Sequence, residues 1–315
     1  MLDHSADRGG VVLLACGRPW CRQTFALQVY DLVADSVSTE KESPHLADRE
    51  VYPNAPLRLV TAEFRFPLSP RLTGADVLSL LGDTLGGELP IVEAISPQGL
   101  QLTFGPDASP PPPAQAGFRL LTRDRMTAVT VASTRVAVET TSYEHWEDFR
   151  DGVVGIALRA IGDDLAAIAG LDRVGLRYIN EVRVPGAAEN VADWENFIAP
   201  ELLATARLAA GQRIRTMQLA LHLDRGDGAE LLMRSGLLKG HFVDDTGALR
   251  LPSPPEEGHF FLIDMDSFWT RPAAYDEWRT DAALEIADGL HEPIDDLFES
   301  CIQEKLRAEV LRRQP

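Results

Sequence analysis

The chain has 315 residues, of which 45% are hydrophobic, enough to bury a sizeable core in one large domain or two smaller ones. Its 48 acidic and 30 basic residues give an acidic protein of formal net charge -18, which disfavours nucleic acid and anionic membranes as partners. Three scattered cysteines exclude a disulfide framework or a zinc cage, and they favour a reducing, cytoplasmic location.

The first fifty residues lack sustained hydrophobic periodicity and end in a polar run, which predicts a poorly ordered leader and linker over 1–50. "VVLLAC" resembles the end of a lipoprotein signal with Cys16 as the modified residue. Its apolar run of about five residues is shorter than the roughly seven to fifteen required, and Asp3 and Asp7 remove the positive start. No segment approaches the ~20 apolar residues that cross a bilayer, so no membrane association is expected.

We expect a first α+β repeat over residues 51–170. Some of its segments have apolar residues at every second position, as in strands, and others at every third or fourth, as in helices. The expected order is a strand at 57–66, a helix at 73–85 capped by Thr73, strands at 99–104, 117–123, 126–132 and 135–141, and a long helix at 143–169. A proline-rich loop at 109–117 interrupts the strands.

Residues 171–315 predict a second α+β repeat in a similar order. We expect a strand at 172–184, a helix at 192–208, strands at 213–224, 229–238, 240–251 and 258–266, and helices over 274–313. Pro293 suits the first turn of a new helix. The C-terminal helices either pack on the sheet or serve as a dimer or partner-binding element.

The two repeats favour an internal duplication. "YEHWEDF" at 143 corresponds to "YDEWRTD" at 275, and each opens the helix that follows a strand. The expected fold is a duplicated strand, helix, antiparallel strands, helix unit. Its helices cover one face of a curved antiparallel sheet, in an order similar to the TATA-binding-protein-like fold. Chance recurrence of Tyr-x-x-Trp is the alternative, and the analogy of topology carries no function.

Several blocks together resemble a sporadically distributed family of uncharacterised bacterial proteins. They are "YPNAPLRLVTAEFRF", "YEHWEDF", "RVGLRYINEV", "HFFLIDMD" and "LHEPIDDLFESCIQEKLR". The most specific are the opening Tyr-Pro-Asn-Ala-Pro and the Arg-x-Gly-Leu-Arg-Tyr-Ile-Asn motif. The resemblance covers roughly residues 51–313 and implies a domain boundary near 51 and a bacterial origin, but no activity.

The first strand of each repeat carries charges at alternate positions. Period two places Arg177 and Glu181 on one face of their strand and Glu63 and Arg65 on one face of theirs. If the strands are equivalent and adjacent, the four residues form a charged cluster on the sheet. Its structural interpretation is a cross-strand ion-pair network; its functional interpretation is a grip on an anion or peptide carboxylate, since a guanidinium suits bidentate recognition.

"LIDMD" provides an acidic pair, Asp264 and Asp266, which two-residue spacing places on one face of a strand. Two carboxylates could bind Mg²⁺ or Mn²⁺, and His259 lies just upstream. Such pairs also commonly face water. No zinc-protease spacing, serine-nucleophile elbow or phosphate-binding loop is present, so no catalytic residue and no cofactor other than this metal is predicted.

These features predict a non-enzymatic binding or regulatory protein that acts through protein–protein interaction. Its partner is an unknown protein or a second copy of the chain. The alternative is a metal-dependent, hydrolase-like enzyme that uses the acidic pair. A third carboxylate or histidine within reach of both aspartates would favour the enzyme.

Overall fold

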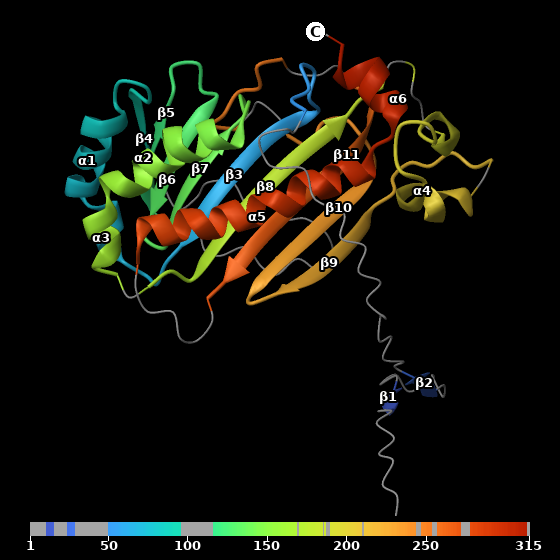
Figure 1. Cartoon of the computed structure of the whole chain (residues 1–315), viewed down its shortest axis with the longest axis horizontal. Coiled ribbons are helices and arrows are strands. Elements are labelled where there is room, and N and C mark those ends of the chain that lie inside the picture. The colour runs from blue at the N-terminus through green and yellow to red at the C-terminus, as the bar shows by residue number, and fades with distance from the viewer. Residues whose placement is uncertain are drawn as a thin grey trace, which may run out of the picture. The chain divides into compact units, whose positions relative to one another are not determined.

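The computed structural model describes residues 11–15, 24–28, 50–95, 116–168, 170–184, 186, 190–209, 211–243, 247–253, 257–271 and 278–313 (Figure 1). The chain divides into two units, Met1–Arg49 and Glu50–Pro315. In the first unit, β1 (Val11–Ala15) pairs antiparallel with β2 (Thr24–Gln28), a pairing that the sequence did not predict. The second unit begins next to the boundary predicted at residue 51.

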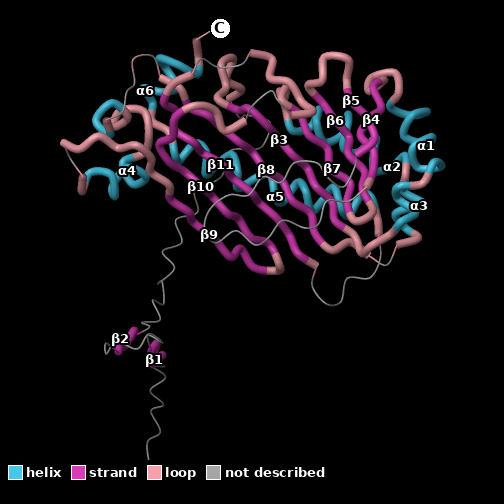
Figure 2. Tube along the Cα trace, turned by 180° about the vertical axis from the view of Figure 1, so that it is seen from behind, coloured by secondary structure: helices cyan, strands magenta, loops and turns pink. Residues whose placement is uncertain are grey.

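The second unit is built on a curved antiparallel sheet of nine described strands (Figure 2), which confirms the expected α+β class. The two central strands, β3 (Leu57–Arg65) and β8 (Arg173–Val182), are antiparallel neighbours. Outward from β3 the order is β7 (Arg135–Thr140), β6 (Thr127–Ala132), β5 (Gly117–Leu121) and β4 (Ile91–Ile95). Outward from β8 it is β11 (His259–Thr270), β10 (Ala229–Lys239) and β9 (Leu219–Gly226).

Helices cover one face of this sheet, as expected. Figure 1 shows the long α5 (Thr280–Cys301) lying across the central strands, where it contacts β8 and β11. On the same side lie α1 (Ala75–Leu85), α2 (Gly155–Ala160) and α3 (Gly162–Ala166). Shorter elements are α4 (Pro200–Arg207), α6 (Glu304–Leu306), the 3₁₀ turns η2 (Pro70–Thr73) and η4 (Val191–Asp193), and the π-helical η3 (Asp148–Val154) and η5 (Arg307–Leu311).

Strand periodicity sorts the side chains between the two faces. On β3, Val60, Ala62 and Phe64 are buried beneath the helices, whereas Glu63 and Arg65 lie on the opposite side. We call this opposite side the open face, because no helix among the described residues covers it (Figure 2). One end of the open face is apolar: Phe242 and Val243 pack there on a cluster formed by Ile179, Phe260 and Leu262.

The helix predicted over 143–169 is not continuous. A π-helical stretch precedes α2, and Ile161 breaks the helix between α2 and α3 with φ -111° and ψ 17°. Gly155 and Gly162 begin the two helices, and glycine weakens a helix by about 1 kcal/mol relative to alanine. The apolar periodicity predicted one continuous helix and did not indicate these interruptions.

The C-terminal prediction was wrong at Pro293, which lies inside the continuous helix α5 rather than at the start of a new one. A proline has no N–H to donate to the carbonyl four residues earlier. That carbonyl belongs to Gly289, and Arg225 of β9 donates to it instead, through Nη1 at 3.4 Å. The chain leaves the helix at Ile302, which is extended and bridges to Ile198. The buried stripe of α5 packs on the sheet.

Other boundaries also differ from the prediction. Thr73 does not cap α1; Gly74 holds that position, and the Thr73 hydroxyl donates to the carbonyl of Pro70 at 3.0 Å. The helix expected over 192–208 is reduced to η4 and α4, and the described residues of 240–251 form no strand. β4 was not predicted, whereas the strand expected at 99–104 lies outside the described residues.

Candidate binding site on the open face of the sheet

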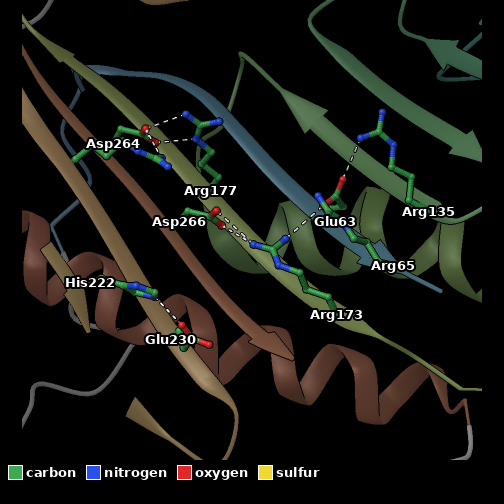
Figure 3. Close-up of polar contacts among 10 residues, drawn as sticks. Glu63, Arg65, Arg135, Arg173, Arg177, His222, Glu230, Asp264 and Asp266 are labelled. Atoms are coloured by element: carbon green, nitrogen blue, oxygen red, sulfur yellow. Dashed lines mark hydrogen bonds and ion pairs between the residues drawn. The ribbon is translucent and has the colours of Figure 1, made fainter. Parts of the chain in front are cut away.

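Arg177 lies at the centre of the open face and binds Asp264 of the neighbouring strand (Figure 3). Its Nε and Nη2 donate to Oδ1 and Oδ2 of the carboxylate, both at 2.8 Å. The Asp264 side chain is 0% exposed, and Arg234 of β10 adds a weaker contact at 3.4 Å. Burial lowers the pKa of Arg177, but the hydrogen bonds and charge of Asp264 outweigh it, and the net pKa is raised. The guanidinium is therefore held charged and fixed in place.

Arg173 lies across the sheet between two carboxylates. Its Nη1 donates to Glu63 Oε1 at 3.3 Å, and its Nη2 donates to the two Asp266 oxygens at 3.2 and 3.3 Å. The guanidinium lies 4.5 Å from the ring centroid of Phe268, a cation–π distance. A Cβ atom at Gly175 would come within 2.5 Å of Arg173 Nη1. The glycine of the Arg-x-Gly-Leu-Arg motif therefore leaves the space in which Arg173 folds back over its own strand.

Glu63 is shared by three arginines. Its carboxylate lies 2.6 Å from Arg65 Nε, 3.1 Å from Arg135 Nη1 and 3.3 Å from Arg173 Nη1 (Figure 3). Burial raises the pKa of Glu63, but the charges of Arg65, Arg135 and Arg173 outweigh it and the net pKa is lowered. Glu63 is therefore the common anion of a small basic cluster.

Glu181 lies at the apolar end of the open face, apart from that cluster. Its Oε1 accepts from the backbone N–H groups of Phe242 and Val243 at 2.7 and 2.9 Å, and its Oε2 accepts from Arg183 at 2.8 Å. The side chain is fully buried. Glu181 thus anchors the segment that follows β10, which is a structural role.

The four residues predicted as one cluster thus separate into three groups. Glu63 and Arg65 are bonded to each other, Arg177 is paired with Asp264, and Glu181 binds backbone. Alternation correctly identified the face that they share, but the partners depend on register. In the ladder, Arg177 stands opposite Thr61 on one side and Asp266 on the other.

The predicted metal residues do not converge. Asp264 and Asp266 share the open face of β11, but Arg177 and Arg173 occupy their oxygens. His259 begins β11 and stands opposite Lys239. Across the described ranges, no group of three or more histidine, cysteine, aspartate or glutamate residues could hold a metal ion.

Sequence reasoning missed Arg135, Arg173 and Glu139. Period two would have placed Arg173 on the face of Arg177, and Arg135 and Glu139 share a face of β7 in the same way. Burial raises the pKa of Glu139, and the charges of Arg119 and Arg135 offset this only in part. Folding therefore favours the protonated form of Glu139.

A second polar group lies under α5, on the helix side of the sheet. The Tyr178 hydroxyl donates to the Tyr143 hydroxyl at 3.2 Å and lies 3.2 Å from Nδ1 of His291. Nε2 of His291 lies 3.4 Å from Asp295, and its ring stacks on Trp146. Burial first, and then the neighbouring Tyr143, raise the pKa of Tyr178, so the phenol stays protonated. This network joins α5 to β8.

No model of a known protein family matches the chain, and comparison with curated proteins and with solved structures finds no significant match. The resemblance to the uncharacterised bacterial family therefore stays a prediction. Within the part of the chain that the structure describes, no helix combines the length and apolar character required to span a membrane.

Proposed function

We propose that this is a non-enzymatic binding or regulatory protein that engages a protein partner through the open face of its sheet. The observation that carries the proposal is the placement of Arg173 and Arg177. Both side chains lie on the sheet face opposite α5, and both are fixed by carboxylates of neighbouring strands. Fixed side chains lose little conformational entropy on binding, so such a surface can recognise a partner at low cost. Arginine is also enriched in protein interfaces.

We also infer that the fold arose by duplication, in the order of the TATA-binding-protein-like fold. Each half begins with a central strand, β3 or β8. The chain then passes to the edge of the sheet, at β4 or β9, returns toward the centre through the strands that follow, and ends in helices. Trp146 and Trp278 support this, since each precedes the helices that close its half and each is buried. The halves differ by one strand, because β4 has no counterpart beyond β9. The open face would then span both halves.

The alternative is a metal-dependent hydrolase that uses Asp264 and Asp266. Their shared face favours it, whereas the arginine partners of both carboxylates oppose it, because a cation would have to displace them. Calorimetric titration of the chain with Mg²⁺ and Mn²⁺ separates the two proposals. Binding that is lost in Asp266→Asn would favour the hydrolase, and absence of heat would favour the binding protein.

The proposal is tested by isolating a tagged full chain from its native cells and identifying co-purifying proteins by mass spectrometry. We place this partner in the cytoplasm, consistent with the three cysteines, and self-association is the second form that the interaction can take. The candidate partner is then produced separately and mixed with the purified chain. A complex of fixed stoichiometry is expected. A chain that remains monomeric and alone in every condition would contradict the proposal.

A further inference from the structure

Three arginines form a row across adjacent strands of the open face. In the sheet register, Arg65 of β3 stands directly opposite Arg135 of β7 on one side and Arg173 of β8 on the other. Like charges directly opposite each other destabilise a sheet. Because the chain as a whole carries a net charge of -18, its composition does not account for a local excess of cations.

The three arginines differ in how fully they are bound. Arg173 contacts two carboxylates and the ring of Phe268, and its side chain is 19% exposed. Arg65 uses only Nε, and Arg135 only Nη1, and both bind the one carboxylate of Glu63. Two further nitrogens of each side chain have no hydrogen-bond partner among the described residues. They are Nη1 and Nη2 of Arg65, and Nε and Nη2 of Arg135. The side chains of Arg65 and Arg135 are each 44% exposed.

The single negative charge of Glu63 can balance one guanidinium, but three arginines share it. Arg173 also binds Asp266 and Phe268 across the sheet, whereas Arg65 and Arg135 bind only Glu63 and have N–H groups that Glu63 does not use. Arg65 and Arg135 both reach Glu63 from directly opposite positions on the neighbouring strands β3 and β7 (Figure 3). Two guanidinium groups of this kind bind an oxyanion through charge-assisted hydrogen bonds.

We infer that Arg65 and Arg135 form a carboxylate-binding site, and that its occupant is an acidic side chain of a protein partner. The inference deepens the proposed function and rests on it. A planar, singly charged carboxylate matches the guanidinium fork. A phosphate group would carry about 1.5 to 2 negative charges beside Glu63 and within the field of an acidic chain, so it would be repelled more strongly.

The test uses the ¹⁵N-labelled full chain, because arginine Nε–Hε signals report weak binding at each guanidinium. Three probes are titrated at low ionic strength: a blocked peptide of alternating glutamate and glycine, its glutamine counterpart, and inorganic phosphate. The variants are the double substitution Arg65→Gln and Arg135→Gln, and the control Arg207→Gln. Arg207 is an exposed arginine paired with Glu195 away from the sheet, so the control removes a similar exposed ion pair.

We expect the glutamate peptide to shift the Arg65 and Arg135 signals in the wild type and in the control. In the double variant we expect binding to weaken at least about tenfold, or about 1.4 kcal/mol. The melting temperature should fall by less than in Glu63→Gln, because the double variant removes two of the three arginines that hold Glu63 charged but also removes two opposed like charges. Three results would overturn the inference: equal binding by the double variant, phosphate binding without peptide binding, or a loss of stability as large as that of Glu63→Gln.

This test is separable from that of the proposed function. If a partner identified from native cells binds the double variant as tightly as the wild type, the carboxylate site is wrong while the binding function stands. If the peptide binds through these arginines but no protein partner is found, the carboxylate-binding site is retained and the proposed protein partner is rejected.

Discussion

Arg177 of β8 and Asp264 of β11 form a two-point ion pair, with Nε–Oδ1 and Nη2–Oδ2 distances of 2.8 Å each. They are diagonal neighbours, because Asp264 stands opposite Ile179 in the ladder. The Asp264 carboxylate has no exposure to water, so Arg177 supplies the interaction that water would otherwise provide. The pair joins the central strand of the second half to its neighbour.

Replacing Arg177 by methionine should destabilise the fold, because it leaves the Asp264 charge buried with only the weaker Arg234 contact. Breaking a buried pair in this way costs about 3 to 5 kcal/mol. Thermal unfolding should therefore show a melting temperature lower by several degrees, and the double variant Arg177→Met with Asp264→Leu should recover part of the loss. Arg207→Met is the control, since an exposed pair contributes about 1 kcal/mol or less. An unchanged melting temperature would contradict the structural role of the Arg177–Asp264 pair.

The Glu63 carboxylate should contribute stability that disappears in acid. Its pKa in the folded chain is lowered by three arginines against the effect of burial. A lowered pKa gives stability that is present above the unfolded value, about 4.3, and is lost as the pH falls through the folded value. Urea denaturation at pH 7 should show Glu63→Gln to be less stable by about 2 kcal/mol. That difference should shrink as the pH falls below about 4; a difference independent of pH would contradict the assignment.

The opposite sign is expected for Glu139. Burial raises its pKa in the folded chain beyond the opposing effect of Arg119 and Arg135, so folding favours the protonated form. Its contribution is therefore favourable at low pH and is lost as the pH rises from the unfolded pKa through the folded one. Glu139→Gln, which stays neutral, should raise the melting temperature at pH 7 by a few degrees and change it little below about pH 4. Destabilisation at pH 7 would show that the charge of Glu139 is needed.

Gly175 should be coupled to Arg173, because a side chain at 175 would meet the Arg173 guanidinium. Gly175→Ala should displace the Arg173 guanidinium from Glu63 and Asp266, with a coupling energy of about 0.5 to 3 kcal/mol, the range for residues in contact. A double-mutant cycle with Arg173→Ala measures this coupling. In the Arg173→Ala background the alanine at 175 should cost little, and an equal cost in both backgrounds would mean that Gly175 serves another purpose.

Local periodicity was sufficient to predict the class of the fold. In "RVGLRYINEV" the alternation of apolar and polar residues predicted the strand and the face that Arg177 and Glu181 share. Helix ends were less predictable, because Pro293 is tolerated where Arg225 of a distant strand donates to the exposed carbonyl of Gly289. Such compensation comes from tertiary contacts, which a local pattern does not contain.

The pairings at the candidate site depend on which strands become neighbours. Arg177 and Asp264 are 87 residues apart in the chain, and only the adjacency of β8 and β11 brings them together. Arg173 could have been identified by period two, since it lies four residues from Arg177 on the same strand. Arg135 could not, because its link to Glu63 depends on the adjacency of β7 and β3. The role of Gly175 could not, because it depends on the path of the Arg173 side chain.

The most direct test of the binding surface compares adjacent residues of β9 that lie on opposite faces of the sheet. His222 lies on the open face with its side chain 56% exposed, and Leu221 lies on the helix side and is 44% exposed. A photo-crosslinking amino acid is placed at one position or the other, in the full chain and in its native cells, and adducts are identified by mass spectrometry. The account predicts a protein adduct, to a partner or a second copy, from position 222 and little from 221. Adducts from 221 alone, or equal adducts from both, would contradict binding through the open face.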